Sequence, residues 1–141
     1  MTVVYLDSNA FAKLYLDDED DQDQVVNSVQ EYGRVASCAI TYAEVAGVFA
    51  RAFHEGRLTQ ESYEEAMVAF SEDWSSTKVY DVTPELSAIA AMLMKGHPGL
   101  RAMDALHLAS ALAQRRSTPI QFLTFDQRLN AVSRNLIPDA F

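Results

Sequence analysis

Four acidic residues stand at points of the chain where carboxylates could take part in chemistry: Asp7, Glu44, Asp104 and Asp126. Carboxylates gathered in one place repel one another and raise one another's pKa values. A divalent cation reverses this effect, and Mg²⁺ and Mn²⁺ prefer oxygen ligands while keeping bound waters. Such a site also takes a phosphate, so metal-assisted hydrolysis of a phosphate ester is the chemistry that these residues would support together.

Each of these acids also has a structural interpretation when it is taken alone. Asp7 and Asp126 could be N-caps of the helices that follow them. Thr41 and Glu44 form a T-x-x-E capping box, and Asp104 could cap a helix that begins there. Because such caps are common, the four acids indicate a site only if the fold brings them together.

The segment around Asp104 weakens the capping interpretation. In RAMDALHLASAL, the apolar residues Leu108, Ala111 and Leu112 follow Asp104 at helical spacing and share its face. This face should pack inward, and a carboxylate is rarely buried there without a partner because an unpaired buried charge is costly. Asp104 is therefore expected to need a cation.

Short apolar runs alternate with longer helical patterns along the whole chain. The predicted strands are 2–6, 34–40, 78–82 and 120–125. The predicted helices are 9–16, 23–32, 42–55, 60–74, 84–96, 101–116 and 126–135. Strands separated by helices predict a parallel sheet with helices on both faces, and ligands bind such sheets at the carboxyl ends of the strands.

This arrangement places three of the acids at one edge of the sheet. Asp7, Glu44 and Asp126 each follow a predicted strand, and parallel strands all end at the same edge. Asp104 lies near the start of the helix that leads into the last strand, and the sequence alone does not put it at that edge.

Composition indicates one domain over residues 1–141, with 49% hydrophobic residues to form its core. The net charge is −9, and six of the acids lie in one run, DDEDDQD (17–23). Without this run and the four acids above, the remaining acidic residues nearly balance the basic residues. Cys38 is the one cysteine, and no signal peptide or membrane span is expected. A cytoplasmic protein without membrane contact is predicted.

Four segments together resemble the signatures of PIN-domain ribonucleases: YLDSNA, TYAEV, AMDALHLASA and FLTFDQRL. Within that family the chain is most similar to VapC-type toxins of type II toxin–antitoxin systems. The resemblance covers nearly the whole chain in length and in the order of elements. It implies an α/β fold with three layers, α/β/α, around a mainly parallel sheet of about four to five strands.

The resemblance also implies a site and a reaction. It carries the family's acidic quartet, as catalytic and metal-binding residues, onto Asp7, Glu44, Asp104 and Asp126. Ser8 and Thr124 match positions where the family often has a small hydroxyl residue near the site. Family members hydrolyse RNA phosphodiesters with Mg²⁺ or Mn²⁺, commonly form homodimers, and are inhibited by a cognate antitoxin that occupies the active-site groove.

Three further residues lie near the acids in the sequence. Arg101 and Arg128 flank Asp104 and Asp126 in the sequence, and they would contact the RNA backbone or offset the acidic charge. His107 has apolar neighbours on both sides, so we interpret it as a packed histidine rather than a metal ligand.

Two other functions on the same fold stay open: an RNA-processing nuclease without an antitoxin, and a catalytically silent module that binds metal or RNA. A receiver-type signalling domain fits poorly, because Asp7 stands alone after the first strand and no lysine follows Phe125. A dehalogenase-type phosphatase needs D-x-D, and Asn9 stands at the second acidic position.

Overall fold

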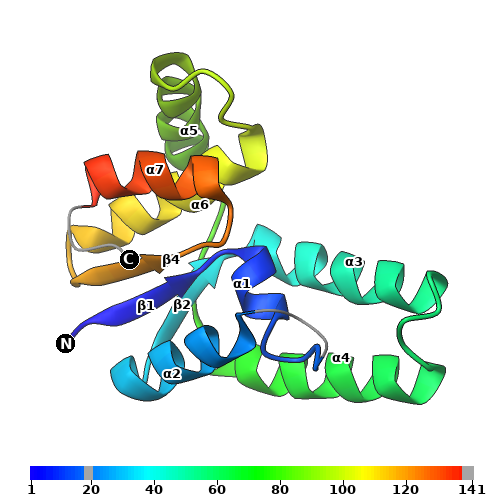
Figure 1. Cartoon of the computed structure of the whole chain (residues 1–141). Helices are drawn as coiled ribbons and strands as arrows, with labels where there is room; N and C mark the ends of the chain where they lie inside the picture. The colour runs from blue at the N-terminus through cyan, green and yellow to red at the C-terminus, as the bar shows by residue number, and fades with distance from the viewer. Residues whose placement is uncertain (18–20, 138–141) are drawn as a thin grey trace.

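We describe the protein from a computed structural model, which defines residues 1–17 and 21–137 (Figure 1). The strands are β1 (Val3–Leu6), β2 (Val35–Cys38), β3 (Lys78–Tyr80) and β4 (Ile120–Leu123). The helices are α1 (Ser8–Ala12), α2 (Gln22–Tyr32), α3 (Ile40–His54), α4 (Gln60–Ser75), α5 (Pro84–Gly96), α6 (Ala102–Arg115) and α7 (Gln127–Leu136). This alternation of strands and helices matches the prediction from the sequence.

All three pairings in the four-stranded sheet are parallel, and the strand order is β3-β2-β1-β4. The chain therefore starts in the middle of the sheet, adds β2 and β3 on one side, and returns to add β4 on the other. The register pairs Leu6 at the end of β1 with Leu123 at the end of β4. The residues that follow these two strands thus meet at the point where the strand order reverses.

Helices cover both faces of the sheet, as the three-layer prediction requires (Figure 1). Val3 and Tyr5 of β1 face the layer of α5, α6 and α7, whereas Val4 and Leu6 face the layer of α1 to α4. All four residues of β1 are at most 2% exposed. A strand buried on both faces reads as a continuous apolar run, which explains the VVYL segment.

An aromatic cluster fixes α3 and α4 against α1. The Phe70 ring of α4 lies 5.2 Å from Phe11 of α1 and 5.1 Å from Tyr42 of α3, measured between ring centroids. Phe49 of α3 lies 6.1 Å from the same ring at a right angle, a favoured geometry for aromatic pairs. This cluster sets the position of α3, the helix that carries Glu44.

The helix boundaries agree with most of the predicted caps but not with the capping box at Thr41. Thr59 and Thr83 are confirmed as N-caps of α4 and α5, each accepting a backbone N–H bond. The capping box is wrong, because α3 begins at Ile40 and the Thr41 hydroxyl instead forms a 2.7 Å hydrogen bond with Ser37 of β2. Capping therefore does not explain Glu44.

Other boundaries differ by a few residues. The helix predicted for 9–16 is the short α1, which passes into turns after Ala12. The last predicted strand, 120–125, ends at Leu123 and leaves Thr124 and Phe125 in the connection to α7. Residues 18–20 of the acidic run lie outside the described residues. None of the described helices combines the length and apolar character that crossing a membrane would require.

We expect Phe70→Ala to lower the free energy of unfolding by about 3–5 kcal/mol, because it removes a fully buried ring and leaves a cavity among aromatic side chains. Urea unfolding measures this difference. Val68→Ala on the same helix is the control, since Val68 is 59% exposed and its loss should change stability by less than about 0.5 kcal/mol. Equal effects for both variants would contradict this account of the core.

Candidate active site

Asp7 directly follows β1 and lies at the carboxyl edge of the sheet, where the strand order reverses. Asp7 is the N-cap of α1 and accepts the Ala10 N–H through Oδ1 at 3.0 Å. Its Oδ2 accepts the hydroxyl of Thr124, the residue after β4, at 2.5 Å. Both the capping interpretation and the predicted place at the sheet edge are therefore correct, and Asp7 is only 5% exposed.

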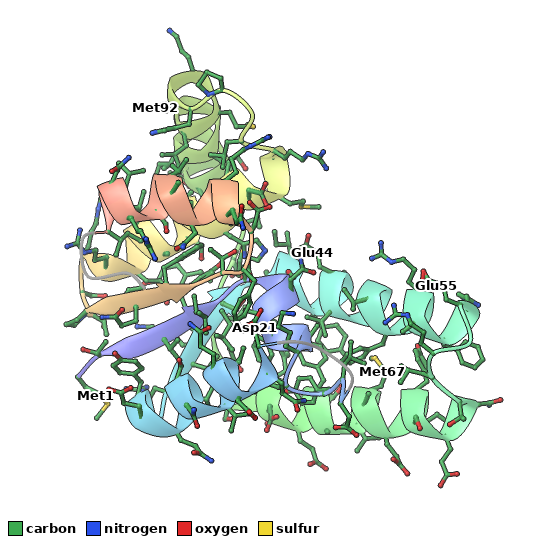
Figure 2. All side chains as sticks on the ribbon, in the orientation of Figure 1. Met1, Asp21, Glu44, Glu55, Met67 and Met92 are labelled. Carbon is green, nitrogen blue, oxygen red and sulfur yellow. The ribbon has the colours of Figure 1, made fainter. Side chains whose placement is uncertain are left out.

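Glu44 comes from the second turn of α3, at the end of the helix nearest the sheet (Figure 2). Its Oε1 accepts a short hydrogen bond from the Ser8 hydroxyl. The same oxygen lies 2.9 Å from Nε2 of His107 on α6. Glu44 is thus tied to α1 through Ser8 and to α6 through His107.

Asp104 is the third residue of α6 and lies in its first turn. Arg101, not Asp104, is the N-cap of that helix, so the capping interpretation of Asp104 is wrong. The side chain is partly buried, and Leu108 and Ala111 on the same face are fully buried, as the spacing predicts. The packing of α6 on the sheet brings this carboxylate to the site.

Asp126 caps α7, accepting the Leu129 N–H at 2.9 Å. Its own backbone N–H donates to the Thr124 hydroxyl at 3.1 Å. Thr124 therefore links the Asp7 carboxylate with the backbone of Asp126. The capping interpretation of Asp126 is correct, and the residue lies beside the other acids.

One pocket of about 240 Å³ gathers three of the four acids. Asp7, Glu44 and Asp104 line it together with Ser8, His107 and Arg51. Asp126 lines an adjoining pocket instead, with Lys13 and Phe125, and the two pockets share Asn9 and Val48. The structure thus brings the predicted residues to one edge of the sheet, with Asp126 at its margin.

The three acids of this pocket differ in how easily they ionise. Burial raises the pKa of Asp7, and the charge of Asp104 adds to this rise, against the opposing effects of His107, Thr124 and the Ala10 N–H. Burial and the charge of Asp126 likewise raise the pKa of Asp104. For Glu44, burial alone would raise the pKa, but the hydrogen bonds from His107 and Ser8 lower it overall.

The donor set is chemically suited to a hard divalent cation, because carboxylate oxygens are the ligands that Mg²⁺ and Mn²⁺ prefer. Within residues 1–17 and 21–137, however, no three His, Cys, Asp or Glu side chains are already arranged to hold a metal ion. The hydrogen bonds that Glu44 accepts from described residues end on Oε1, which leaves Oε2 as the oxygen open to a ligand. The carboxylates would have to converge further to share one ion.

The PIN domain family model matches residues 4–135. This chain belongs to the PIN domain family. Ribonuclease VapC45 of Mycobacterium tuberculosis (strain CDC 1551 / Oshkosh) is 32% identical to it over 113 residues, which are 80% of this chain and 77% of that protein. Ribonuclease VapC49 of strain ATCC 25618 / H37Rv matches it to the same extent. The resemblance to VapC-type PIN domains is therefore confirmed.

Two solved structures share the PIN domain fold with this chain. The first, VapBC2 from Rickettsia felis bound to a DNA fragment from their promoter, has a TM-score of 0.63 at 14% identity and covers 99% of this chain and 96% of that one. PAE2754 from Pyrobaculum aerophilum has a TM-score of 0.61 at 19% identity, covering 97% and 88%. At these identities the likeness establishes the fold alone.

The two arginines singled out in the sequence take different positions in this PIN domain. The charge of Arg101 contributes to holding down the pKa of Asp104, against the larger effects of burial and Asp126. The guanidinium of Arg128 donates to the Gly99 carbonyl at 3.1 Å. Gly99 has φ +90°, and a Cβ there would lie 2.9 Å from Nη1 of Arg128, so glycine permits this close contact.

Two residues of the pocket have roles that the sequence patterns did not predict. His107 is packed, as predicted, at 3% exposure, but it also reaches Glu44 from within the core. Arg51 also lines the pocket, and the sequence did carry a signal for it. Glu44, Gly47, Val48 and Arg51 all line the pocket at the spacing of one helical face.

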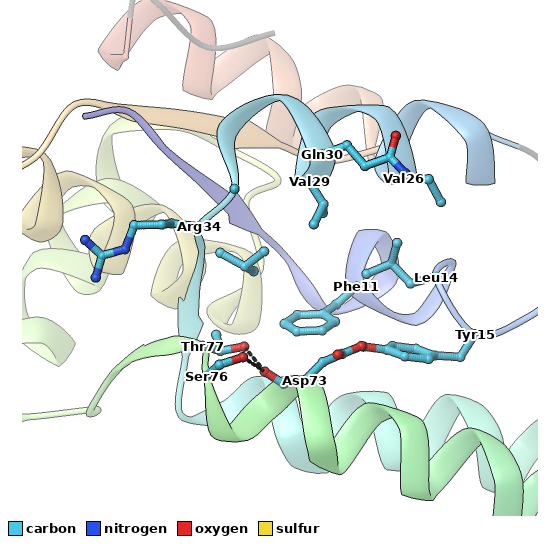
Figure 3. A pocket seen from close by; sticks show the side chains of 12 residues that line it. Phe11, Leu14, Tyr15, Val26, Val29, Gln30, Arg34, Asp73, Ser76 and Thr77 are labelled. Atoms are coloured by element: carbon cyan, nitrogen blue, oxygen red, sulfur yellow. Dashed lines mark hydrogen bonds between the residues drawn. The ribbon is translucent and has the colours of Figure 1, made fainter.

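A larger pocket of about 540 Å³ lies away from the acidic site, between α2 and α4 (Figure 3). Its lining includes Phe11, Val29 and Val35, with Asp73 as its carboxylate. The Tyr15 hydroxyl donates to Asp73 at 2.6 Å, so that acid already has a partner. This pocket lacks the gathered carboxylates of the acidic site and is not a candidate for the same chemistry.

We expect Asp7→Asn to stabilise the metal-free protein at neutral pH and to lose this advantage as the pH falls. Because burial raises the pKa of Asp7, the wild type loses stability as the pH rises from the unfolded value near 3.8 through the folded value. Asparagine caps a helix as well as aspartate and carries no charge. Urea unfolding in EDTA at neutral and acidic pH measures the difference.

The control is Glu72→Gln, which removes an exposed carboxylate from α4. This substitution should change stability little at either pH. If Asp7→Asn were less stable than the wild type at neutral pH, then the charge of Asp7 would not be costly in the folded protein.

Proposed function

We propose that this PIN domain is a metal-dependent endoribonuclease that hydrolyses RNA phosphodiester bonds. The observation that carries the proposal is the convergence of Asp7, Glu44 and Asp104 on one pocket, from three elements far apart in the sequence. The ribonuclease names of the two relatives support the same activity. The raised pKa values of Asp7 and Asp104 fit a pocket whose crowded acids need a cation.

In this proposal Asp7, Glu44 and Asp104 would hold Mg²⁺ or Mn²⁺, and Asp126 would position a second ion or a water. A cation held there would supply an activated water and would offset charge on the phosphate. Thr124 holds Asp7 through Oδ2, and Ser8 holds Glu44 through Oε1, so each keeps a carboxylate oriented. Arg51, which lines the same pocket, would contact a phosphate of the RNA.

We further propose that the chain is the toxin of a toxin–antitoxin pair. The VapC names of its relatives and the VapBC2 fold neighbour support this assignment. A cognate antitoxin would then occupy the active-site groove, and the toxin would act in the cytoplasm as a homodimer. An RNA-processing nuclease without an antitoxin is the alternative, and an antitoxin gene beside the toxin gene would distinguish them.

Asp7→Asn and Asp104→Asn should each lower RNA cleavage by about 10²-fold or more, because each removes a charge that the transition state depends on. Cleavage of a pool of structured RNAs in Mn²⁺, with and without EDTA, is the measurement. The matched control is Asp81→Asn, since Asp81 follows β3 at the same edge of the sheet but is absent from the acidic pocket.

Asp81→Asn should cleave RNA at the wild-type rate. Wild-type activity in both Asp7→Asn and Asp104→Asn would exclude the proposed mechanism. Cleavage that persists in EDTA would exclude its metal dependence.

Arg51→Ala should weaken RNA binding about tenfold, the effect of losing one charge-assisted hydrogen bond. The slope of log K against log salt should also fall by about 0.7, as expected when one phosphate contact of a single strand is lost. Fluorescence anisotropy with labelled RNA at several salt concentrations measures both. Arg57→Ala is the control, because Arg57 pairs with Glu55 at 3.3 Å outside the acidic pocket. An unchanged salt slope in Arg51→Ala would remove Arg51 from the RNA-binding surface.

A further inference from the structure

A buried histidine connects the core of the protein with the acidic pocket. His107 is 3% exposed, and both of its ring nitrogens are engaged. Nδ1 lies 2.9 Å from the Tyr5 hydroxyl, and Nε2 lies 2.9 Å from Oε1 of Glu44 and 3.1 Å from the Ser8 hydroxyl oxygen. The series Tyr5–His107–Glu44 therefore runs from β1 through α6 to α3.

We propose that Tyr5 and His107 are positioning residues that orient the Glu44 carboxylate, occupying Oε1 so that Oε2 is the oxygen offered to the cation. This inference rests on the proposed function, because it concerns the same pocket. It adds two residues that act through Glu44 and determine how this metal ligand is presented.

The hydrogen-bond chemistry gives this series a direction. An ionised carboxylate only accepts hydrogen bonds, so Nε2 of His107 must carry a proton to bond Glu44. The Ser8 hydroxyl donates to Glu44 and can accept from the same Nε2–H. Tyr5 donates its hydroxyl proton to Nδ1, which completes a set in which each donor meets an acceptor.

Packing fixes the first member of the series. The Tyr5 ring stacks on Phe122 of β4 with centroids 5.2 Å apart and an interplanar angle of 12°. It meets the His107 ring edge-on at 79°. Because Tyr5 is fully buried in the central strand, its hydroxyl cannot turn away without disturbing the sheet. The orientation of His107, and through it that of Glu44, is thus set by the strand that also delivers Asp7.

A purely structural role would be served equally well by an apolar side chain. Polar groups are costly to bury, and a chain of them in a core is favourable only when every member is satisfied. Hydrogen bonds that orient metal-binding side chains typically change metal affinity or activity by about 10–100-fold when they are removed. The substitutions that separate the two roles must therefore keep the packing and change only the bond to Glu44.

The pair His107→Gln and His107→Leu makes this separation. Both remove the partner of Tyr5, but only glutamine keeps an N–H group that can reach Glu44 in place of Nε2. The full-length variants are titrated with Mn²⁺ alone by calorimetry, and kcat and KM are measured with a cleavable RNA. Tyr5→Phe tests the first bond, and His54→Gln, on the exposed end of α3, is the control.

We expect His107→Leu to weaken Mn²⁺ binding about 10–100-fold and to lower kcat by a similar factor while KM for RNA stays within about twofold. His107→Gln should recover most of both losses, and His54→Gln should match the wild type. Nitrogen NMR of the histidine rings in the metal-free protein should show a protonated Nε2 at His107. In Tyr5→Phe, where Nδ1 has lost its donor, the fraction of this tautomer should fall.

Equal Mn²⁺ affinity and kcat in His107→Leu and His107→Gln, both folded and with a wild type that binds and cleaves, would overturn the positioning role alone. An unprotonated Nε2 in the wild type would overturn it as well. A wild type that neither binds Mn²⁺ nor cleaves RNA would overturn the proposed function and this inference together.

Discussion

The rest of the site is arranged around one buried charge. Asp7 is almost completely enclosed, and an ionised carboxylate in a protein interior is costly unless hydrogen bonds or opposite charges compensate it. The fold supplies these compensations from both directions of the chain, since the start of α1 provides the Ala10 N–H and the end of β4 provides Thr124. The parallel register of β1 and β4 is what brings the second donor within reach.

The same edge then gathers further acids, so the site is a place where the protein gives up stability. Asp126 acts on the ionisation of Asp104, and Asp104 acts on that of Asp7. Such strain is usual where function and stability compete. The apolar layers on both faces of the sheet, and the aromatic cluster around Phe70, provide stability that offsets the cost of the crowded acids.

Much of this arrangement could be predicted from the sequence, because it depends on local patterns. Alternating strands and helices indicated the parallel sheet, and the sheet in turn placed Asp7 and Asp126 at its carboxyl edge. The helix caps at Thr59 and Thr83 could also be predicted, because each threonine directly precedes a helical pattern. The capping box predicted at Thr41 was wrong, because its hydroxyl forms a hydrogen bond with Ser37 of β2 instead. No local sequence pattern indicates that bond. The contact of His107 with Glu44 could not be predicted, because it depends on how α6 packs relative to α3. Arg51 could have been predicted, because it lies two turns after Glu44 on the same face of the helix.

The strand order has a consequence for when the site comes into being. Asp7 is made well before its hydrogen-bonding partner Thr124, which lies 117 positions further along the chain. Contacts of such long sequence separation form late in folding, after loop closure has been achieved. In a growing polypeptide the acids are therefore not yet buried together, and the pKa shifts that burial causes are absent. For a protein that cleaves RNA, this timing would keep the nascent chain inert beside the messenger and the ribosome that are producing it.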